Sequence, residues 1–174
     1  EEILRTPQMS ISGEEIEPEK RELSAEELAF SYDKRLIIDG ISLNIPEHTT
    51  TAIVGPSGSG KTTLVSLLAR FWDPEKGRVL LSARDVKDYD MDSLMANFSF
   101  VFQNVYLFHD SILNNIRFAR PEASLEEVIE VSKKACCHDF ITALPDGYNT
   151  VIGEGGASLS GGEKQRISIA RAMM

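Results

Sequence analysis

Cysteine is nearly absent from this sequence: among 174 residues only Cys136 and Cys137 are cysteines, and they are adjacent. Two neighbouring cysteines cannot cross-link distant loops, which excludes the class of small secreted domains held together by disulfides. Long hydrophobic runs are lacking as well, since no stretch approaches the roughly 18 apolar residues that a membrane-spanning helix needs. The first residues show no basic-then-apolar signal-peptide pattern. We therefore expect a reducing, cytoplasmic setting.

Positive charge is also scarce, with 18 Lys and Arg residues against 27 Asp and Glu residues and a net charge of −9. Proteins that bind nucleic acids present a basic face, so this acid excess argues against a nucleic-acid partner. Hydrophobic residues make up 42% of the chain, which at this length is enough for one domain with its own core. A local anion site stays compatible with the acidity, because backbone N–H groups and one lysine suffice to form it.

The first half of the chain reads mainly as strands. Residues 1 to about 22 are charge-rich, and residues 13–22 combine charges of both signs with a proline, which is typical of a linker or a mobile lead-in. Apolar residues alternate with polar or small ones over residues 28–32 and again over residues 41–45, which predicts two strands. Ser24–Glu27 also matches a helix capping box, but we favour the strand there. Thr49–Gly55 is β-branched and uncharged, which predicts a strand buried on both faces.

Further along, helices and short strands alternate. Leucines and a phenylalanine at helical spacing over residues 64–71 predict a helix with one apolar face that ends before Pro74. Residues 77–81 and Phe98–Gln103 predict two more short strands. Asp110–Cys137 is mostly helical in pattern, with Pro121 and Ser124 as signals for a helix start. The Leu-Pro-Asp-Gly-Tyr stretch that follows predicts a turn.

A glycine-rich loop carries the clearest chemistry. The pattern Gly-x-x-x-x-Gly-Lys-Thr lies between an apolar strand and an amphipathic helix, which is the context of a P-loop. Its glycines let backbone N–H groups surround a polyphosphate, Lys61 reaches the terminal phosphates, and the Thr62 hydroxyl can bind Mg²⁺. The predicted phosphate-binding residues are Gly55, Pro56, Ser57, Gly58, Ser59, Gly60, Lys61, Thr62 and Thr63.

A second phosphate-binding device lies about a hundred residues later. Ser160, Gly161, Gly162 and Glu163 open the last helix of the chain, and a helix N-terminus of this kind offers backbone N–H groups to an anion. Gln103, after a predicted strand, can offer its side-chain oxygen to Mg²⁺ or water.

The two devices together make the chain resemble the ATPase domain of an ABC transporter, over about residue 21 onward. Stretches such as ARFWDPEKG, LFHDSILNNI and LPDGYNTVIGEGG are most similar to the exporter branch. The resemblance implies an α/β fold: a P-loop NTPase core, a small antiparallel β subdomain near Tyr32 and a helical subdomain over about 104–158. It makes residues 1–20 a connector from a membrane domain outside this chain and residues 21–174 a partial ATPase domain.

The same resemblance implies the roles of the site residues. Tyr32 stacks on adenine, Lys61 and Gln103 are catalytic, and Thr62 and Gln103 bind Mg²⁺. Each ATP lies between the P-loop of one domain and Ser160–Glu163 of a second, identical or different ATPase domain. The complete protein is then an ATP-hydrolysing exporter at the cytoplasmic face of a membrane. The C-terminal part of the core, with the family's catalytic acid, is expected beyond Met174, and this chain alone is expected to be inactive.

Several residues depart from the family pattern. Glu163 stands where glutamine is usual, Val151 and Gly155 stand where an acid and an arginine are usual, His48 replaces a turn glycine, and Ser82-Ala83 replaces Asp-Gly. Histidine tolerates positive φ better than most residues, which predicts a left-handed backbone at His48.

Two other functions remain open at this point. One is a non-transport ABC ATPase of the chromosome-maintenance and DNA-repair type. That type has a very long coiled coil between its two motifs, whereas here they lie 98 residues apart (159 − 61). The other is a non-catalytic nucleotide-sensing module.

Overall fold

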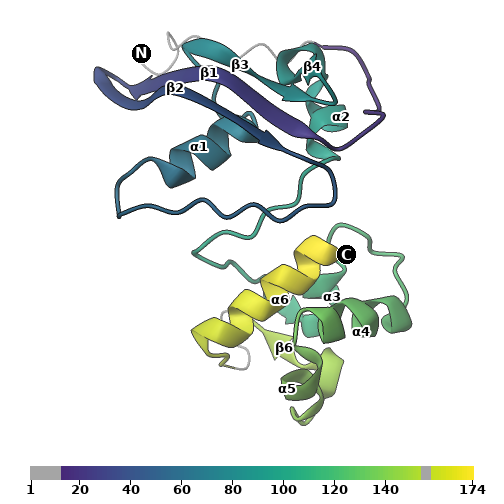
Figure 1. Ribbon diagram of the computed structural model, residues 1–174. Helices are drawn as coiled ribbons and strands as arrows, with labels where there is room; N and C mark the ends of the chain where they lie inside the picture. The colour runs from purple at the N-terminus through teal and green to yellow at the C-terminus, as the bar shows by residue number, and fades with distance from the viewer. Residues whose placement is uncertain (1–12, 154–157) are drawn as a thin grey trace, which may run out of the picture. The chain divides into compact units, whose positions relative to one another are not determined.

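A computed structural model describes residues 13–153 and 158–174, which divide into two compact units between Phe98 and Ser99 (Figure 1). Residues 1–12 of the predicted connector, and Gly155, lie outside the described residues.

A four-stranded antiparallel sheet organises the first unit, in the order β2-β1-β3-β4. Its strands are β1 (Leu23–Tyr32), β2 (Arg35–Ile45), β3 (Lys76–Leu81) and β4 (Arg84–Asp85). The alternating apolar pattern therefore predicted β1 and β2 correctly, and the capping-box alternative at Ser24 is wrong. The antiparallel sheet next to Tyr32 is confirmed.

Tight turns in this unit use left-handed residues. Ser82 and Ala83, which connect β3 to β4, have φ of 53° and 62°, and two such residues in a row suit the twist of a two-residue hairpin. His48 has φ of 59°, which confirms the prediction from its place in the sequence.

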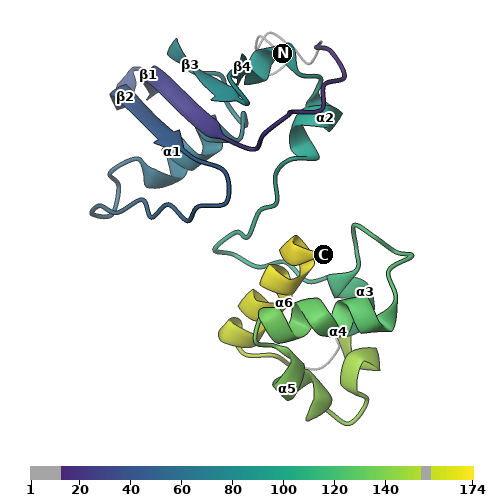
Figure 2. The same ribbon diagram turned by 45° about the vertical axis from the view of Figure 1, so that its right-hand side comes forward.

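Helices cover the sheet and close the first core. They are α1 (Lys61–Leu68), the short 3-10 helix η2 (Val86–Asp88) and α2 (Met91–Met95). In Figures 1 and 2, α1 lies against one face of β1 and β2. The predicted helix is thus correct but shorter than expected. The largest fully buried side chains of this core are Tyr89, Leu28, Leu67, Leu94, Val79 and Val86.

The charged segment from Gly13 onward is held on this unit. The Glu14 N–H donates to Asp88 O at 2.9 Å, and the Asp90 N–H donates to Glu14 O at 2.9 Å. A Cβ on Gly13 would lie 2.2 Å from the Tyr89 backbone, so only glycine permits this approach. This part of the predicted linker is therefore packed against the loop before α2.

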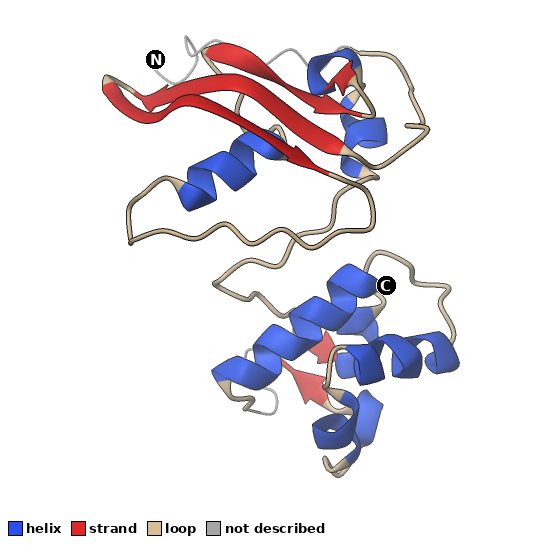
Figure 3. Ribbon diagram, in the orientation of Figure 1, coloured by secondary structure: helices blue, strands red, loops and turns tan. Residues whose placement is uncertain are grey.

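Two predicted strands are wrong. Thr49–Gly55 is an extended loop between β2 and α1 (Figure 3), and Val54 is 87% exposed. Phe98–Gln103 is also irregular. A strand needs hydrogen-bonding neighbours, and no described residue pairs with either segment as a strand. Their β-branched and aromatic composition favours pairing in a sheet, but composition alone does not supply a partner strand.

The second unit is mainly helical. Its elements are β5 (Asp110–Ser111), α3 (Ile112–Ile116), α4 (Leu125–Lys134), α5 (His138–Thr142), η3 (Gly147–Asn149), β6 (Val151–Ile152) and α6 (Gly161–Met173). β5 pairs antiparallel with β6. Asp110–Cys137 is thus helical only in part, because β5 and an irregular stretch before Ser124 interrupt it. The helix start at Ser124 and the turn after Leu144 are confirmed.

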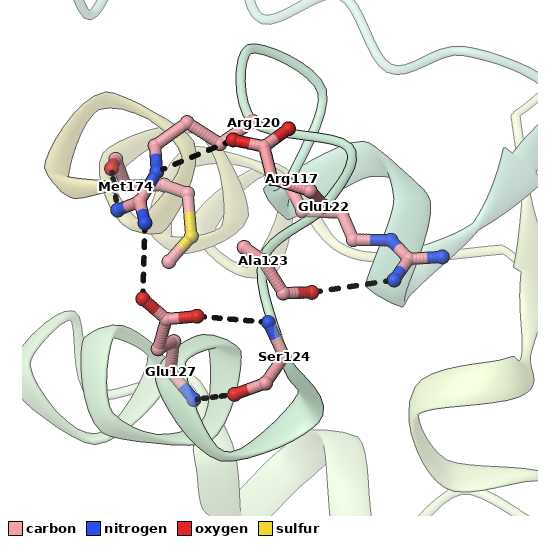
Figure 4. Close-up of polar contacts among 7 residues, drawn as sticks. All are labelled: Arg117, Arg120, Glu122, Ala123, Ser124, Glu127 and Met174. Carbon is pink, nitrogen blue, oxygen red and sulfur yellow. Dashed lines mark hydrogen bonds and ion pairs between the residues drawn. The ribbon is translucent and has the colours of Figure 1, made fainter.

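Local hydrogen bonds fix where α4 begins (Figure 4). The Ser124 hydroxyl accepts from the Glu127 N–H, and the Glu127 carboxylate accepts from the Ser124 N–H at 2.8 Å. The Arg120 guanidinium donates to the same carboxylate at 3.0 Å and to the Met174 carbonyl at 3.2 Å. These contacts tie the start of α4 to the end of α6. The core of the second unit includes the buried residues Ile112, Ile116, Val128, Ile141, Ile152 and Ile167.

Candidate functional site

The P-loop of the first unit ends in an uncapped helix. Gly60, the N-cap of α1, has φ of 88° and provides no side chain to the first-turn amides, and that turn contains no acidic residue. A Cβ at Gly60 would approach the side chains of Ile37 and Ile38 on β2 at 3.1 Å, so a larger residue would be both crowded and strained by the positive φ. The backbone N–H groups at this helix end are therefore available to an anion, and the helix dipole favours one there.

Lys61 is folded over the loop that precedes it. Its Nζ donates to Gly55 O at 2.9 Å and to Pro56 O at 2.7 Å. Gly55, Pro56, Ser57, Gly58 and Ser59 are all exposed. A single ammonium group thus lies among loop backbone groups, and it can exchange the two carbonyl oxygens for phosphate oxygens.

The hydroxyl residues after Lys61 differ in exposure. Thr62 is exposed, whereas Thr63 is buried at 8% exposure against the core. A hard divalent cation takes oxygen ligands, so the Thr62 hydroxyl fits the predicted Mg²⁺ contact. Because Thr63 is buried, its side chain is better placed to anchor α1 on the core than to bind a cation.

Tyr32 closes β1 and is 41% exposed. Its ring meets Phe30 at 4.9 Å between centroids and Trp72 at 5.9 Å, at interplanar angles of 89° and 87°. The ring is therefore held on the surface of the same unit as the P-loop. The sequence predicted Tyr32 but gave no separate signal for Trp72, which lies four residues after α1 within a stretch similar to the exporter branch.

Gln103 lies in the second unit, exposed and in an irregular segment. Gln103 does not belong to a strand. The oxygen of its side-chain amide is a suitable ligand for Mg²⁺. Thr62 and Gln103 belong to different units, so their joint Mg²⁺ site stays a prediction.

The second phosphate-binding device also has the predicted local form. Ser160 is the N-cap of α6 and forms a capping box with Glu163. One Glu163 oxygen, Oε2, accepts from both the Ser160 N–H and the Ser160 hydroxyl at 2.7 Å. These hydrogen bonds to Ser160 hold the pKa of the Glu163 carboxyl below its usual range. Gly161 and Gly162 are exposed, and a Cβ on Gly161 would meet nothing within 4 Å.

The opposite end of α6 is clamped to the segment after Gln103. The Arg171 guanidinium donates to the Asn115 carbonyl and side-chain oxygen, each at 2.8 Å, and to Tyr106 O at 3.0 Å, and it lies over the Phe108 ring. Asn115 is 1% exposed, and its amide donates back to Phe108 O at 3.0 Å. These contacts could not be predicted from the sequence, because no spacing rule connects residues so far apart along the chain.

No helix in the described part of the chain has the length and apolar character needed to cross a membrane.

The predicted site residues are divided between the two units. The first unit contains the P-loop and Tyr32, and the second contains Gln103 and Ser160–Glu163.

Comparison with known proteins gives one consistent result. The family described as "ABC transporter" matches residues 38–174. The chain is 47% identical over 154 residues to the mitochondrial iron-sulfur clusters transporter ATM1 of Candida glabrata, covering 88% of this chain and 21% of that protein. It is 45% identical over 161 residues to the ATP-dependent lipid A-core flippase of Haemophilus influenzae, covering 91% of this chain and 27% of that protein.

The fold comparison agrees. A bacterial Atm1-family ABC exporter, solved with ATP bound, matches with a TM-score of 0.84 and 42% identity over 91% of this chain and 28% of its own. The predicted fold class, an ABC ATPase domain, is thereby confirmed. The chain spans about a fifth to a little over a quarter of the length of these proteins.

Proposed function

The chain belongs to the ABC transporter family, and from this premise we propose that it is the ATP-binding and ATP-hydrolysing part of an ABC exporter. The observation that carries the proposal is the first turn of α1, where Gly60 supplies no cap and Lys61 holds its amino group among the loop carbonyls. Amides and an ammonium group gathered at one helix end make a polyphosphate site.

The roles follow from the chemistry of each side chain. Lys61 exchanges its contacts with Gly55 and Pro56 for terminal phosphate oxygens, and the Tyr32 ring stacks on the base. The Thr62 hydroxyl and the Gln103 amide oxygen would hold Mg²⁺. When bound, Mg²⁺ neutralises charge that develops on the transferred phosphate. Tyr32, Thr62 and Gln103 are exposed and Lys61 is partly exposed, which is compatible with these roles.

A second ATPase domain completes the site in this proposal. Gly161 and Gly162 are exposed at the start of α6 and lack side chains, so a phosphate can approach their amides closely. We place Ser160, Gly161 and Gly162 against the γ-phosphate held by the P-loop of the other domain, which a water molecule attacks in line. Amides directed at that phosphate stabilise the charge of the transition state.

The remainder of the protein supplies the membrane domain in this proposal. The matched relatives are about four to five times as long as the aligned chain, and their names describe transport. This chain then lies at the cytoplasmic face of the membrane. The similarity to exporters favours this assignment over a chromosome-maintenance or DNA-repair ATPase, and a hydrolysis assay separates it from a nucleotide-sensing module.

The test is to replace Lys61 by alanine in the full-length protein. The change removes the only full positive charge of the loop, so we expect ATP affinity to fall at least about tenfold, the effect of roughly 1.4 kcal/mol, and ATP hydrolysis to be lost. Calorimetric titration with ATP and a phosphate-release assay measure the two effects. Lys76, exposed on β3, is the matched control, and Lys76→Ala should leave both unchanged. Undiminished ATP affinity in Lys61→Ala would refute the proposed site.

A further inference from the structure

Trp72 is the third ring of an aromatic cluster on the first unit, and none of the roles above uses it. Building on the proposed function, we propose that Trp72 is a positioning residue for the nucleobase: it holds the Tyr32 ring in the orientation in which the base stacks. Trp72 acts through Tyr32 and does not itself contact the base.

The geometry of the cluster supports a positioning role. Tyr32 is nearly perpendicular to both neighbours, at 89° to Phe30 and 87° to Trp72. Edge-to-face contacts of this kind are the favoured arrangement of aromatic pairs. Two such contacts oppose rotation of the Tyr32 ring about its Cβ–Cγ bond. Phe30 is 6% exposed and belongs to the core, so one side of the ring rests on a fixed support.

The other support, Trp72, lies on the surface, so burial in the core does not explain its fixed position. It is 48% exposed, and Tyr32 is 41% exposed. Large aromatic residues left exposed beside each other often mark a binding surface. Without Trp72 the Tyr32 ring would be restrained on its Phe30 side alone.

The backbone before Trp72 is anchored in the core. Arg70 is 3% exposed, has a left-handed φ of 54°, and donates through one guanidinium nitrogen to Val86 O at 3.0 Å and to Tyr89 O at 3.3 Å. The Phe71 N–H donates to Ser66 O at 2.8 Å, which ends α1 tightly.

The backbone after Trp72 is anchored in the sheet. The Glu75 N–H donates to Ala29 O at 2.9 Å, and the Glu75 carboxylate accepts from the Ser31 hydroxyl at 3.4 Å. Both contacts are made with β1, the strand that ends at Tyr32. The loop that carries Trp72 is therefore attached to the same strand as the ring it supports, and little further ordering is needed to bring the two together.

The phosphate loop is connected to the same hairpin. Gly60 packs so closely on Ile37 and Ile38 of β2 that its missing Cβ would lie 3.1 Å from each. β2 pairs with β1 up to the contact of Arg35 with Tyr32. The triphosphate site and the base site therefore share one rigid support, which is what a single nucleotide needs.

The test compares ATP with inorganic tripolyphosphate, which lacks the base, by calorimetry on the full-length protein. For Trp72→Ala we expect ATP affinity to fall roughly three- to tenfold, as the loss of one edge-to-face pair implies, while tripolyphosphate affinity is unchanged. Trp72→Phe keeps a ring edge and should restore most of the ATP affinity. Leu36→Ala, which removes a 54% exposed apolar side chain from the same hairpin, is the matched control and should change neither affinity.

A double-mutant cycle with Tyr32→Ala tests whether Trp72 acts through Tyr32. If it does, the double variant loses no more ATP affinity than Tyr32→Ala alone. Additive losses would show that Trp72 contacts the base directly, and they would overturn the inference. An equal loss of tripolyphosphate affinity would overturn it too, since Trp72 would then be structural. Unchanged ATP affinity in Trp72→Ala would reject the inference alone, whereas the Lys61→Ala variant tests the proposed function separately.

Discussion

At the residue scale, Glu163, which stands where glutamine is usual in the family, is the departure with the clearest chemical consequence. Its carboxylate accepts the hydroxyl proton of Ser160 at 2.7 Å. In the proposed complex that proton is the one Ser160 would donate to the γ-phosphate of the other domain. Glu163 thus competes with the nucleotide for one donor and adds a negative charge beside it. A glutamine at this position would donate its own N–H to the serine oxygen and leave the hydroxyl proton free.

We therefore expect Glu163→Gln to strengthen the contact between the two domains. The ATP concentration that gives half-maximal hydrolysis by the full-length protein should fall several-fold, because the competing acceptor and its charge are removed. Glu127→Gln alters the equivalent capping box of α4 and serves as the control, with no expected change. A higher ATP requirement in Glu163→Gln would mean that the carboxylate supports the contact and does not compete with it.

At the scale of elements, the join of β1 and β3 depends on a glycine. Gly77 has φ of 80°, and a Cβ there would lie 2.2 Å from Glu26 O and 2.5 Å from Glu27 O. The register between the strands shifts at this point, which brings the two backbones together. Because both atoms belong to the backbone, a side chain at this position would force the backbone to shift.

Gly77→Ala should lower the free energy of unfolding by about 2–4 kcal/mol, the range for steric and backbone strain combined. Gly40→Ala is the matched control on β2. Gly40 also has a positive φ, 63°, but the nearest atom to a Cβ there is 3.8 Å away. Its substitution should cost about 1 kcal/mol, as measured by urea denaturation of both variants. Equal costs would show that the β1–β3 contact relaxes freely.

The start of α4 should depend on pH. The Ser124 N–H and the Arg120 guanidinium donate to Glu127 and hold the pKa of its carboxyl below the ordinary value of 4.5. A carboxyl whose pKa is lowered in the folded state adds stability above its unfolded pKa, and this is lost as the pH falls through the lowered value. Corrected for intrinsic exchange rates, the first-turn amides of α4 should thus exchange faster below about pH 4.5.

Hydrogen exchange followed by mass spectrometry measures this effect. Glu127→Gln cannot titrate at this position, so the exchange of these amides should lose most of its dependence on acid pH. If the variant and the original protein respond to acid identically, the capping box of α4 is not the origin of the effect.

At the scale of the whole molecule, the proposed composite site predicts complementation between two inactive variants. Ser160→Arg should bind ATP almost normally, because Ser160 serves the nucleotide of the other domain, yet it should not hydrolyse ATP. Lys61→Ala fails for the opposite reason. A heterodimer of the two keeps one intact site, so mixing the full-length variants should restore part of the phosphate release. A mixture that stays inactive although heterodimers form would contradict action between domains.

Sequence patterns predicted the parts of the site that depend on a few consecutive residues. The N-caps at Ser124 and Ser160, the left-handed turn at His48 and the helix after the P-loop all match the structure. Each depends on backbone geometry and on hydrogen bonds that reach three or four residues along the chain, so the local sequence contains the information needed.

Only the tertiary structure decided the rest. Thr49–Gly55 has the composition of a buried strand, but a strand forms through hydrogen bonds to neighbours, and no described residue supplies them. The contact of Trp72 with Tyr32 and the clamp of Arg171 on Asn115 join residues 40 and 56 positions apart (72 − 32, 171 − 115). Burial and contact between distant residues depend on how the elements pack, because the packing partner of a side chain is set by the fold and not by its sequence neighbours.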